Sequence, residues 1–90
     1  MTRLTPEIEM TRHARTRMQQ RSIPMDMIDL LLRFGDCRAA GKGSESYYFT
    51  NRSWRRVKDH LGEALKTFER YRNIYLIAAD GVIVTAAHRY

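Results

Sequence analysis

Ninety residues with a formal net charge of +6 allow one domain with a modest core, and we expect residues 1–90 to form it. No run of eighteen apolar residues and no basic-then-apolar leader is present, so neither a membrane span nor a secretory signal is expected. Cys37 is the single cysteine, which excludes an internal disulfide and is typical of a reducing compartment. We therefore expect a cytoplasmic protein, either a monomer or a homodimer.

The first predicted element is a helix from about Pro6 to Gln20. Thr5 is a suitable N-cap, Pro6 suits the first helical position, and Glu7 supplies an acid in the first turn. The apolar stripe of this helix is thin, so most of its surface is expected to face solvent or a polar partner.

A second helix is predicted from near Pro24 to Gly35. Its sequence, "PMDMIDLLLRF", is apolar on nearly all sides, so we expect it to be the central helix or to be covered by another chain. Gly35 is expected to take the left-handed position that often ends a helix.

The periodicity changes after Gly35. "DCRAA" and "SESYYFT" are predicted as two strands joined at "GKG". A third helix is expected from Asn51 or Ser53 to about Arg72, with a bend or break at Gly62. Two further strands, "NIYLIAA" and "VIVTAAHR", flank Asp80-Gly81, a strong hairpin signal. The order α-α-β-β-α-β-β predicts an α+β fold, with two N-terminal helices on a twisted antiparallel four-stranded sheet.

The last hairpin predicts which side chains share a face. If Asp80 and Gly81 form the loop, Tyr75 pairs with Ala86, and Asn73 pairs with His88. His88, Tyr75 and Tyr90 would then lie together on the face that becomes polar toward the end of the chain. An acid/base site and a plain sheet edge are both consistent with this arrangement.

Arginine accounts for 13 of the 16 basic residues, and guanidinium groups make forked hydrogen bonds to phosphate. Two segments, residues 11–21 and 51–58, are rich in basic residues, and neither contains an acidic residue. This clustering favours RNA or another nucleic acid as the partner. The basic residues concerned are Arg12, Arg15, Arg17, Arg21, Arg52, Arg55, Arg56 and Lys58.

The first of these segments also places His13 and Arg17 one helical turn apart, with Arg21 near the next turn. They could form a basic ridge for phosphates. Alternatively, they could have structural roles, with Arg17 paired to Asp26 or Asp29. The sequence leaves both interpretations open.

The stretch "HARTRMQQRSIPMDMIDLLLRFGD", with the later "SWRRVKDHLG" and "DGVIVTAAHR", resembles a family of small bacterial proteins of unknown function. Its opening His-Ala…Arg-Met…Arg motif corresponds to His13, Arg17, Met18 and Arg21. We associate this family with the RelE/ParE-like toxin superfamily. The resemblance implies a toxin-like α+β fold, binding to RNA or the ribosome, and neutralisation by an antitoxin protein.

Many members of that superfamily cleave messenger RNA without a metal, whereas others act on DNA gyrase. The resemblance implies His88 and Tyr90 as catalytic residues and Glu45 as a base. Cleavage also requires a cation for the phosphorane, for which Arg72 or Arg89 is suitable, and Tyr75 or Tyr90 could stack on a base. No cofactor is expected, and His13, Cys37, His60 and His88 lack the spacing of a metal site. The alternative is a noncatalytic nucleic-acid or protein-binding module.

Overall fold

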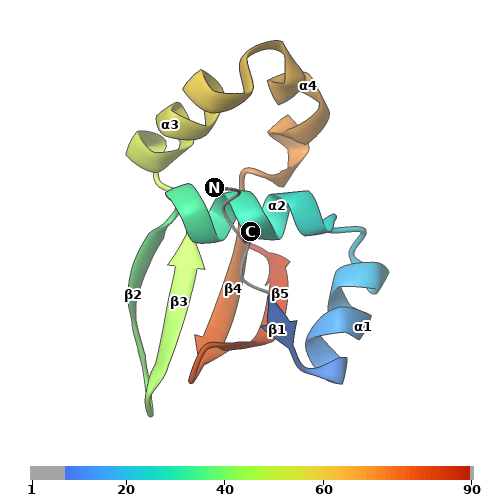
Figure 1. Ribbon diagram of the computed structural model, residues 1–90, viewed down its shortest axis with the longest axis vertical. Coiled ribbons are helices and arrows are strands. Elements are labelled where there is room, and N and C mark those ends of the chain that lie inside the picture. The colour runs from blue at the N-terminus through green and yellow to red at the C-terminus, as the bar shows by residue number, and fades with distance from the viewer. Residues whose placement is uncertain (1–7, 90) are drawn as a thin grey trace, which may run out of the picture.

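The computed structural model describes residues 8–89, which form an α+β fold around a five-stranded mixed sheet in the order β1-β5-β4-β3-β2. The strands are β1 (Glu9–Met10), β2 (Asp36–Gly41), β3 (Ser44–Tyr48), β4 (Ile74–Ala79) and β5 (Val82–His88). The helices are α1 (Arg12–Gln20), α2 (Met25–Phe34), α3 (Asn51–Leu61) and the one-turn α4 (Leu65–Phe68), with 3-10 turns at Gly62–Ala64 and Glu69–Tyr71. Figure 1 shows α2 crossing the sheet, with α3 and α4 beyond one end of the strands.

The first helix is shorter than predicted, and the sheet has one more strand. Glu9 and Met10 pair in parallel with Val82 and Ile83 of β5. Glu9 and Met10 therefore form a strand, whereas the sequence predicted a helix there. The N-cap is Thr11, whose hydroxyl accepts a hydrogen bond from the backbone N–H of Ala14 at 3.0 Å. The predicted cap at Thr5 and Pro6 lies outside the described residues. The parallel pairing makes the sheet mixed rather than antiparallel.

The core lies between one face of the sheet and the helices. α2 contributes Met27, Ile28 and Leu31, all fully buried, which confirms its predicted central position. α3 packs on α2, where the ring of His60 lies 5.1 Å from that of Phe34. The chain's own elements therefore cover the apolar helix. The buried apolar residues are Ala14, Met18, Ile23, Met27, Ile28, Leu30, Leu31, Trp54, Val57, Ile74, Leu76, Ala78, Ile83 and Ala86.

Gly35 ends α2, but not in the left-handed conformation that the sequence suggested. Its φ is −67° and its ψ is 164°, a conformation open to other residues. Glycine is needed there for space, because a Cβ would lie 2.5 Å from the carbonyl oxygen of Leu31 and 2.7 Å from its Cδ1. That Cβ would also lie 3.1 Å from the carbonyl oxygen of Tyr48, so the glycine permits close approach between the helix end and β3.

We expect Gly35→Ala to lower the free energy of unfolding by about 1–3 kcal/mol, the usual cost of inserting a group into a packed site. Urea denaturation measures this change. Gly43→Asn is the control, since nothing lies within 4 Å of the Gly43 Cβ position and asparagine tolerates positive φ. It should cost less than about 1 kcal/mol, and equal losses in the two variants would contradict the packing explanation.

The middle of the chain follows the sequence prediction closely. β2 and β3 form the expected antiparallel hairpin, with Lys42 and Gly43 at positive φ in its loop. α3 begins at Asn51 behind a capping box, in which Thr50 and Ser53 bond reciprocally. Gly62, at φ 56°, ends the helix, as expected of the break at that position.

The last hairpin turns at Asp80-Gly81 as predicted, but its register is shifted by a bulge. Ala79 pairs with Val82 and Ala78 with Ile83, whereas Ile77 pairs with Thr85, so Val84 is left without a partner. An unpaired residue inverts the faces of every residue beyond it. The predicted pairing of Asn73 with His88 is therefore wrong, because His88 pairs with Ile74.

Candidate functional site

The sheet has one face turned away from the core, and strand register defines it. Tyr48 of β3 pairs with Tyr75 of β4, which pairs with Ala87 of β5. Ser46 pairs with Arg38 on β2. Because paired residues share a face, these side chains lie together opposite the core residues of the same strands. We call this surface the open face, and it comprises Asp36, Arg38, Ser46, Tyr48, Tyr75, Ile77, Thr85, Ala87 and Arg89.

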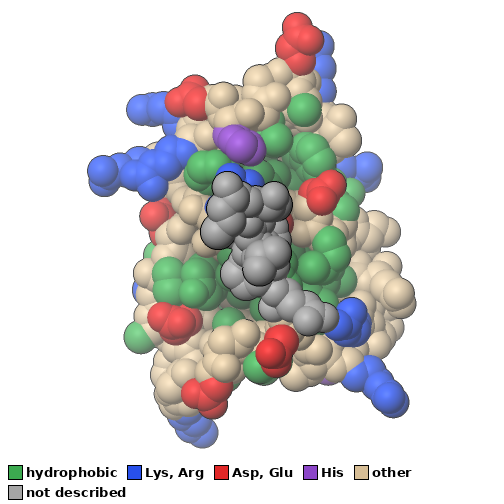
Figure 2. All heavy atoms as spheres, viewed as in Figure 1, with side chains coloured by type: hydrophobic (Ala, Val, Ile, Leu, Met, Phe, Trp, Pro, Cys, Tyr) green, Lys and Arg blue, Asp and Glu red, His purple; other side chains and the backbone are tan. Residues whose placement is uncertain are grey.

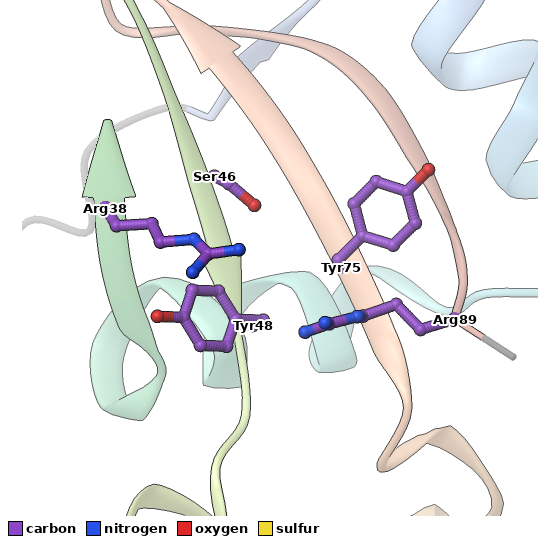
Figure 3. A pocket seen from close by; sticks show the side chains of 5 residues that line it. All are labelled: Arg38, Ser46, Tyr48, Tyr75 and Arg89. Carbon is purple, nitrogen blue, oxygen red and sulfur yellow. The ribbon is translucent and has the colours of Figure 1, made fainter. Parts of the chain in front are cut away.

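A hollow of about 180 Å³ lies on the open face, lined by Arg38, Ser46, Tyr48, Tyr75 and Arg89. Figure 3 shows the guanidinium of Arg38 next to the ring of Tyr48, with Arg89 reaching across β4 from β5. The Arg38 and Arg89 Cζ atoms lie 5.4 and 5.5 Å from the Tyr48 ring centroid, within the range of cation–π attraction. Two cations thus flank one aromatic ring; we call this the tyrosine hollow.

A second hollow of about 390 Å³ adjoins the first and shares Arg89 with it. Phe49, Arg72, Asn73 and Ile74 line the remainder. The Arg72 guanidinium donates a hydrogen bond to the side-chain oxygen of Asn51, the first residue of α3. We call this second site the asparagine hollow, after Asn73 in its lining. Through Arg72 it connects the end of the sheet to the start of α3.

The linings of these hollows contain three arginines and no acidic residue. Asp36 lies on the open face opposite Tyr48 but does not line either hollow. On the helix-bearing side, Figure 2 shows acidic side chains interspersed among the basic ones, outside the region drawn in grey. The open face thus combines positive charge with exposed aromatic edges.

His88 does not line either hollow. Its partner across the sheet is the buried Ile74, so its side chain is on the helix-bearing side, where its ring stacks on Tyr71 at 6.3 Å. The prediction that His88 shares a face with Tyr75 is therefore wrong. The bulge at Val84 causes this difference, and it places Arg89 beside Tyr75 instead.

Glu45 pairs with Ala78, near the hairpin end of β4, and its carboxylate accepts a 3.5 Å hydrogen bond from the Cys37 thiol. Partial burial raises the pKa of the Cys37 thiol, and the Glu45 carboxylate raises it further. The thiol is therefore mostly protonated near neutral pH and a weak nucleophile. Four residues along the strands and two inter-strand spacings separate Glu45 from His88, which amounts to about 16 Å. The two groups are too far apart to act on one proton directly.

The motif residues on α1 lie apart from the open face. Met18 is buried in the core, and the Nε of Arg17 lies 3.5 Å from Nε2 of His13. The Nε atom of Arg21 is buried. Among the described residues an ion pair joins Arg33 to Asp29, and Arg17 makes none with either predicted aspartate. α1 packs against β5.

The second basic segment lies on α3, where Arg52, Arg55, Arg56 and Lys58 are all exposed. They occupy two sides of the helix. Arg55 and Lys58 follow Asn51 by four and seven residues, so they lie on the same side of α3 as Asn51, the residue to which Arg72 is hydrogen-bonded. Arg52 and Arg56 lie on a different side of the helix.

Within residues 8–89, no three His, Cys, Asp or Glu side chains are grouped so as to hold a metal ion. No helix in this part of the chain has the length and apolar character needed to span a membrane. Tyr90 lies outside the described residues. Comparison with protein-family models, curated proteins and solved structures found no match to this chain.

Sequence reasoning placed Tyr75, Arg89 and Arg72 among the candidates, and the structure brings these three to the two hollows. It missed Arg38, Ser46, Tyr48, Phe49 and Asn73. The alternation in "SESYY" indicates that Tyr48 and Ser46 share a face, but nothing local to the sequence indicates that β3 pairs with β4.

Proposed function

We propose that this domain binds single-stranded RNA, free or on the ribosome, on the open face of its sheet. The observation that carries the proposal is Tyr48, whose ring is flanked by the Arg38 and Arg89 guanidinium groups. Bases stack on aromatic rings, while arginines bind the adjoining phosphates. Tyr75 offers a second ring in the same hollow.

The side of α3 that carries Asn51 extends this positive surface. Arg72 connects the asparagine hollow to Asn51, and Arg55 and Lys58 continue along the same side of the helix. An RNA strand that leaves the hollow in that direction would meet further cations. The net charge of +6 adds long-range attraction to a polyanion.

Single-stranded RNA suits this face better than a duplex. A base must be unpaired and splayed out before its ring can stack on a protein aromatic. A protein partner such as an antitoxin, or DNA gyrase, remains the competing interpretation. Binding of such a protein to the open face would support this competing interpretation only if no form of RNA competed with the protein.

Binding without cleavage is the form of the function that the geometry favours. His88 lies on the opposite side of β5 from Arg89 and about 16 Å from Glu45, so the expected acid and base are not assembled around the two hollows. The α+β order fits a relationship to the cytoplasmic RelE/ParE-like toxins, and metal-independent cleavage by His88, Arg72 and Tyr90 is the alternative under that relationship.

Fluorescence anisotropy with a labelled RNA of about ten nucleotides tests the proposal. We expect the single strand to bind at least about tenfold more tightly than a hairpin duplex of the same length at equal salt, since duplex bases cannot stack on tyrosine. Equal affinities would indicate charge-driven binding alone. Intact RNA after incubation with ribosomes and chelator supports the noncatalytic form, and cleavage that His88→Ala abolishes would overturn it.

Salt dependence tests the extension along α3. For four to six phosphate contacts, the logarithm of affinity should fall against the logarithm of salt concentration with a slope of roughly −3 to −4. Arg55→Ala should reduce the magnitude of this slope by about 0.7, the value for one single-strand phosphate. Arg56→Ala is the matched control and should leave it unchanged. A slope in Arg55→Ala that equals the wild-type slope would remove α3 from the interface.

A further inference from the structure

Arg89 belongs to both hollows, so it lies between two distinct environments. On one side are the two tyrosine rings, and on the other are Asn73 and Arg72. The backbone N–H of Arg89 bonds to the carbonyl oxygen of Asn73, which anchors the end of β5 beside that asparagine. The Arg89 guanidinium can therefore contact an anionic group that lies between the two hollows.

We propose that the two hollows together hold one dinucleotide step of RNA, with a nucleoside in each hollow and the connecting phosphate at Arg89, and that the asparagine hollow selects adenine. This inference deepens the proposed RNA-binding function and rests on it. The inference rests on Arg89, which lines both an aromatic and an amide-bearing hollow.

The spacing of the hollows bears on the conformation of the strand. Asn73 is the turn residue before β4 and Tyr75 is the second residue of β4, so their Cα atoms are at most about 7 Å apart. This upper limit is about twice the 3.4 Å rise between stacked nucleotides of one strand. The two hollows thus leave room for neighbouring bases that are unstacked from each other, as bases recognised by proteins in single-stranded RNA commonly are.

The two hollows differ in the chemistry they present. A tyrosine ring stacks on any base, so the tyrosine hollow is expected to tolerate all four. The exposed Asn73 side chain offers one donor and one acceptor, a pattern that matches N6 and N7 of adenine. Sequence preference should therefore arise at one of the two positions.

Competition of dinucleoside monophosphates against a labelled oligocytidylate of about ten nucleotides tests the proposal. ApC, CpA and CpC are compared, because the direction of the strand is unknown. We expect one of the adenine-containing dinucleotides to compete about tenfold better than CpC. Asn73→Ala should abolish that difference between the dinucleotides, and Asn73→Asp should also abolish it because the carboxylate lacks the donor.

The role of Arg89 has its own comparison. CpA or ApC should bind more tightly than adenosine, which lacks a phosphate, to the wild type. Arg89→Ala should remove most of this gain, whereas Arg89→Lys should retain part of it. If Arg89→Ala weakens adenosine and dinucleotide equally, the phosphate assignment is wrong. If RNA binds but adenine is not preferred, or is still preferred in Asn73→Ala, the dinucleotide inference fails and RNA binding stands. If no RNA binds, the proposed function itself fails.

Discussion

Replacing Tyr48 and Arg89 together by alanine is expected to weaken binding of single-stranded RNA by about 100-fold or more. Stacking of one base on an aromatic ring is worth about 1–3 kcal/mol, and a hydrogen bond to a charged group adds about 1.5–3 kcal/mol. Both groups line the tyrosine hollow, so the variant removes one of its two rings and one of its two cations. Fluorescence anisotropy at constant salt measures the loss.

Two controls separate recognition from charge and folding. Tyr48→Phe keeps the ring and should bind within about twofold of the wild type. Arg12→Ala removes one exposed positive charge from the start of α1 and should cost only a small, salt-dependent part of the affinity. A loss in Arg12→Ala as large as that of the double variant would assign binding to net charge instead of the open face.

Leu31→Asp is expected to unfold the protein. Leu31 is a fully buried core residue of α2, and burying an unpaired carboxylate costs several kcal/mol. A domain of this length typically has only about 5–13 kcal/mol of total stability. Circular dichroism and urea denaturation should show loss of the cooperative transition or a large shift of its midpoint.

Met25→Asp is the matched control on the same helix. Met25 is the first residue of α2 and is 45% exposed, and a negative charge in the first turn is favourable to the helix dipole. This variant should retain stability within about 1 kcal/mol. A folded Leu31→Asp protein, or equal losses in the two variants, would mean that α2 is not the central helix.

Much of the fold follows from local signals in the sequence. The proline at the start of the second predicted helix, the glycines around Lys42, and Asp80-Gly81 correctly predicted α2 and both hairpins. These signals work because each depends on the conformation of a few neighbouring residues.

Two features could not be predicted because they depend on distant pairing. Glu9 and Met10 form a strand only because Val82 and Ile83 lie beside them, and their own sequence was consistent with a helix. The bulge at Val84 lies within an uninterrupted apolar run, "VIVTAA", without a glycine to mark it. One unpaired residue was enough to exchange the faces of His88 and Arg89.

The same bulge explains why the candidate site was only partly predicted. Tyr75 and Arg89 were identified by residue type, yet the sequence prediction grouped Tyr75 with His88, whose ring lies beside Tyr71. Tyr48 and Arg38 entered the site through the pairing of β3 with β4 and β2, which requires the strand order. Residue types indicated which side chains could bind RNA, and the strand register determined which of them lie together on one face.

The most direct test is a titration of isotopically labelled protein with a single-stranded RNA of about ten nucleotides, followed by amide chemical shifts. Binding to the open face predicts that the largest changes occur at Ser46, Tyr48, Asn73, Tyr75 and Arg89, with small changes at His13 and Arg17 on α1. If the largest changes instead fall on α1 or around Glu45, with the tyrosine hollow unaffected, RNA does not bind where we propose.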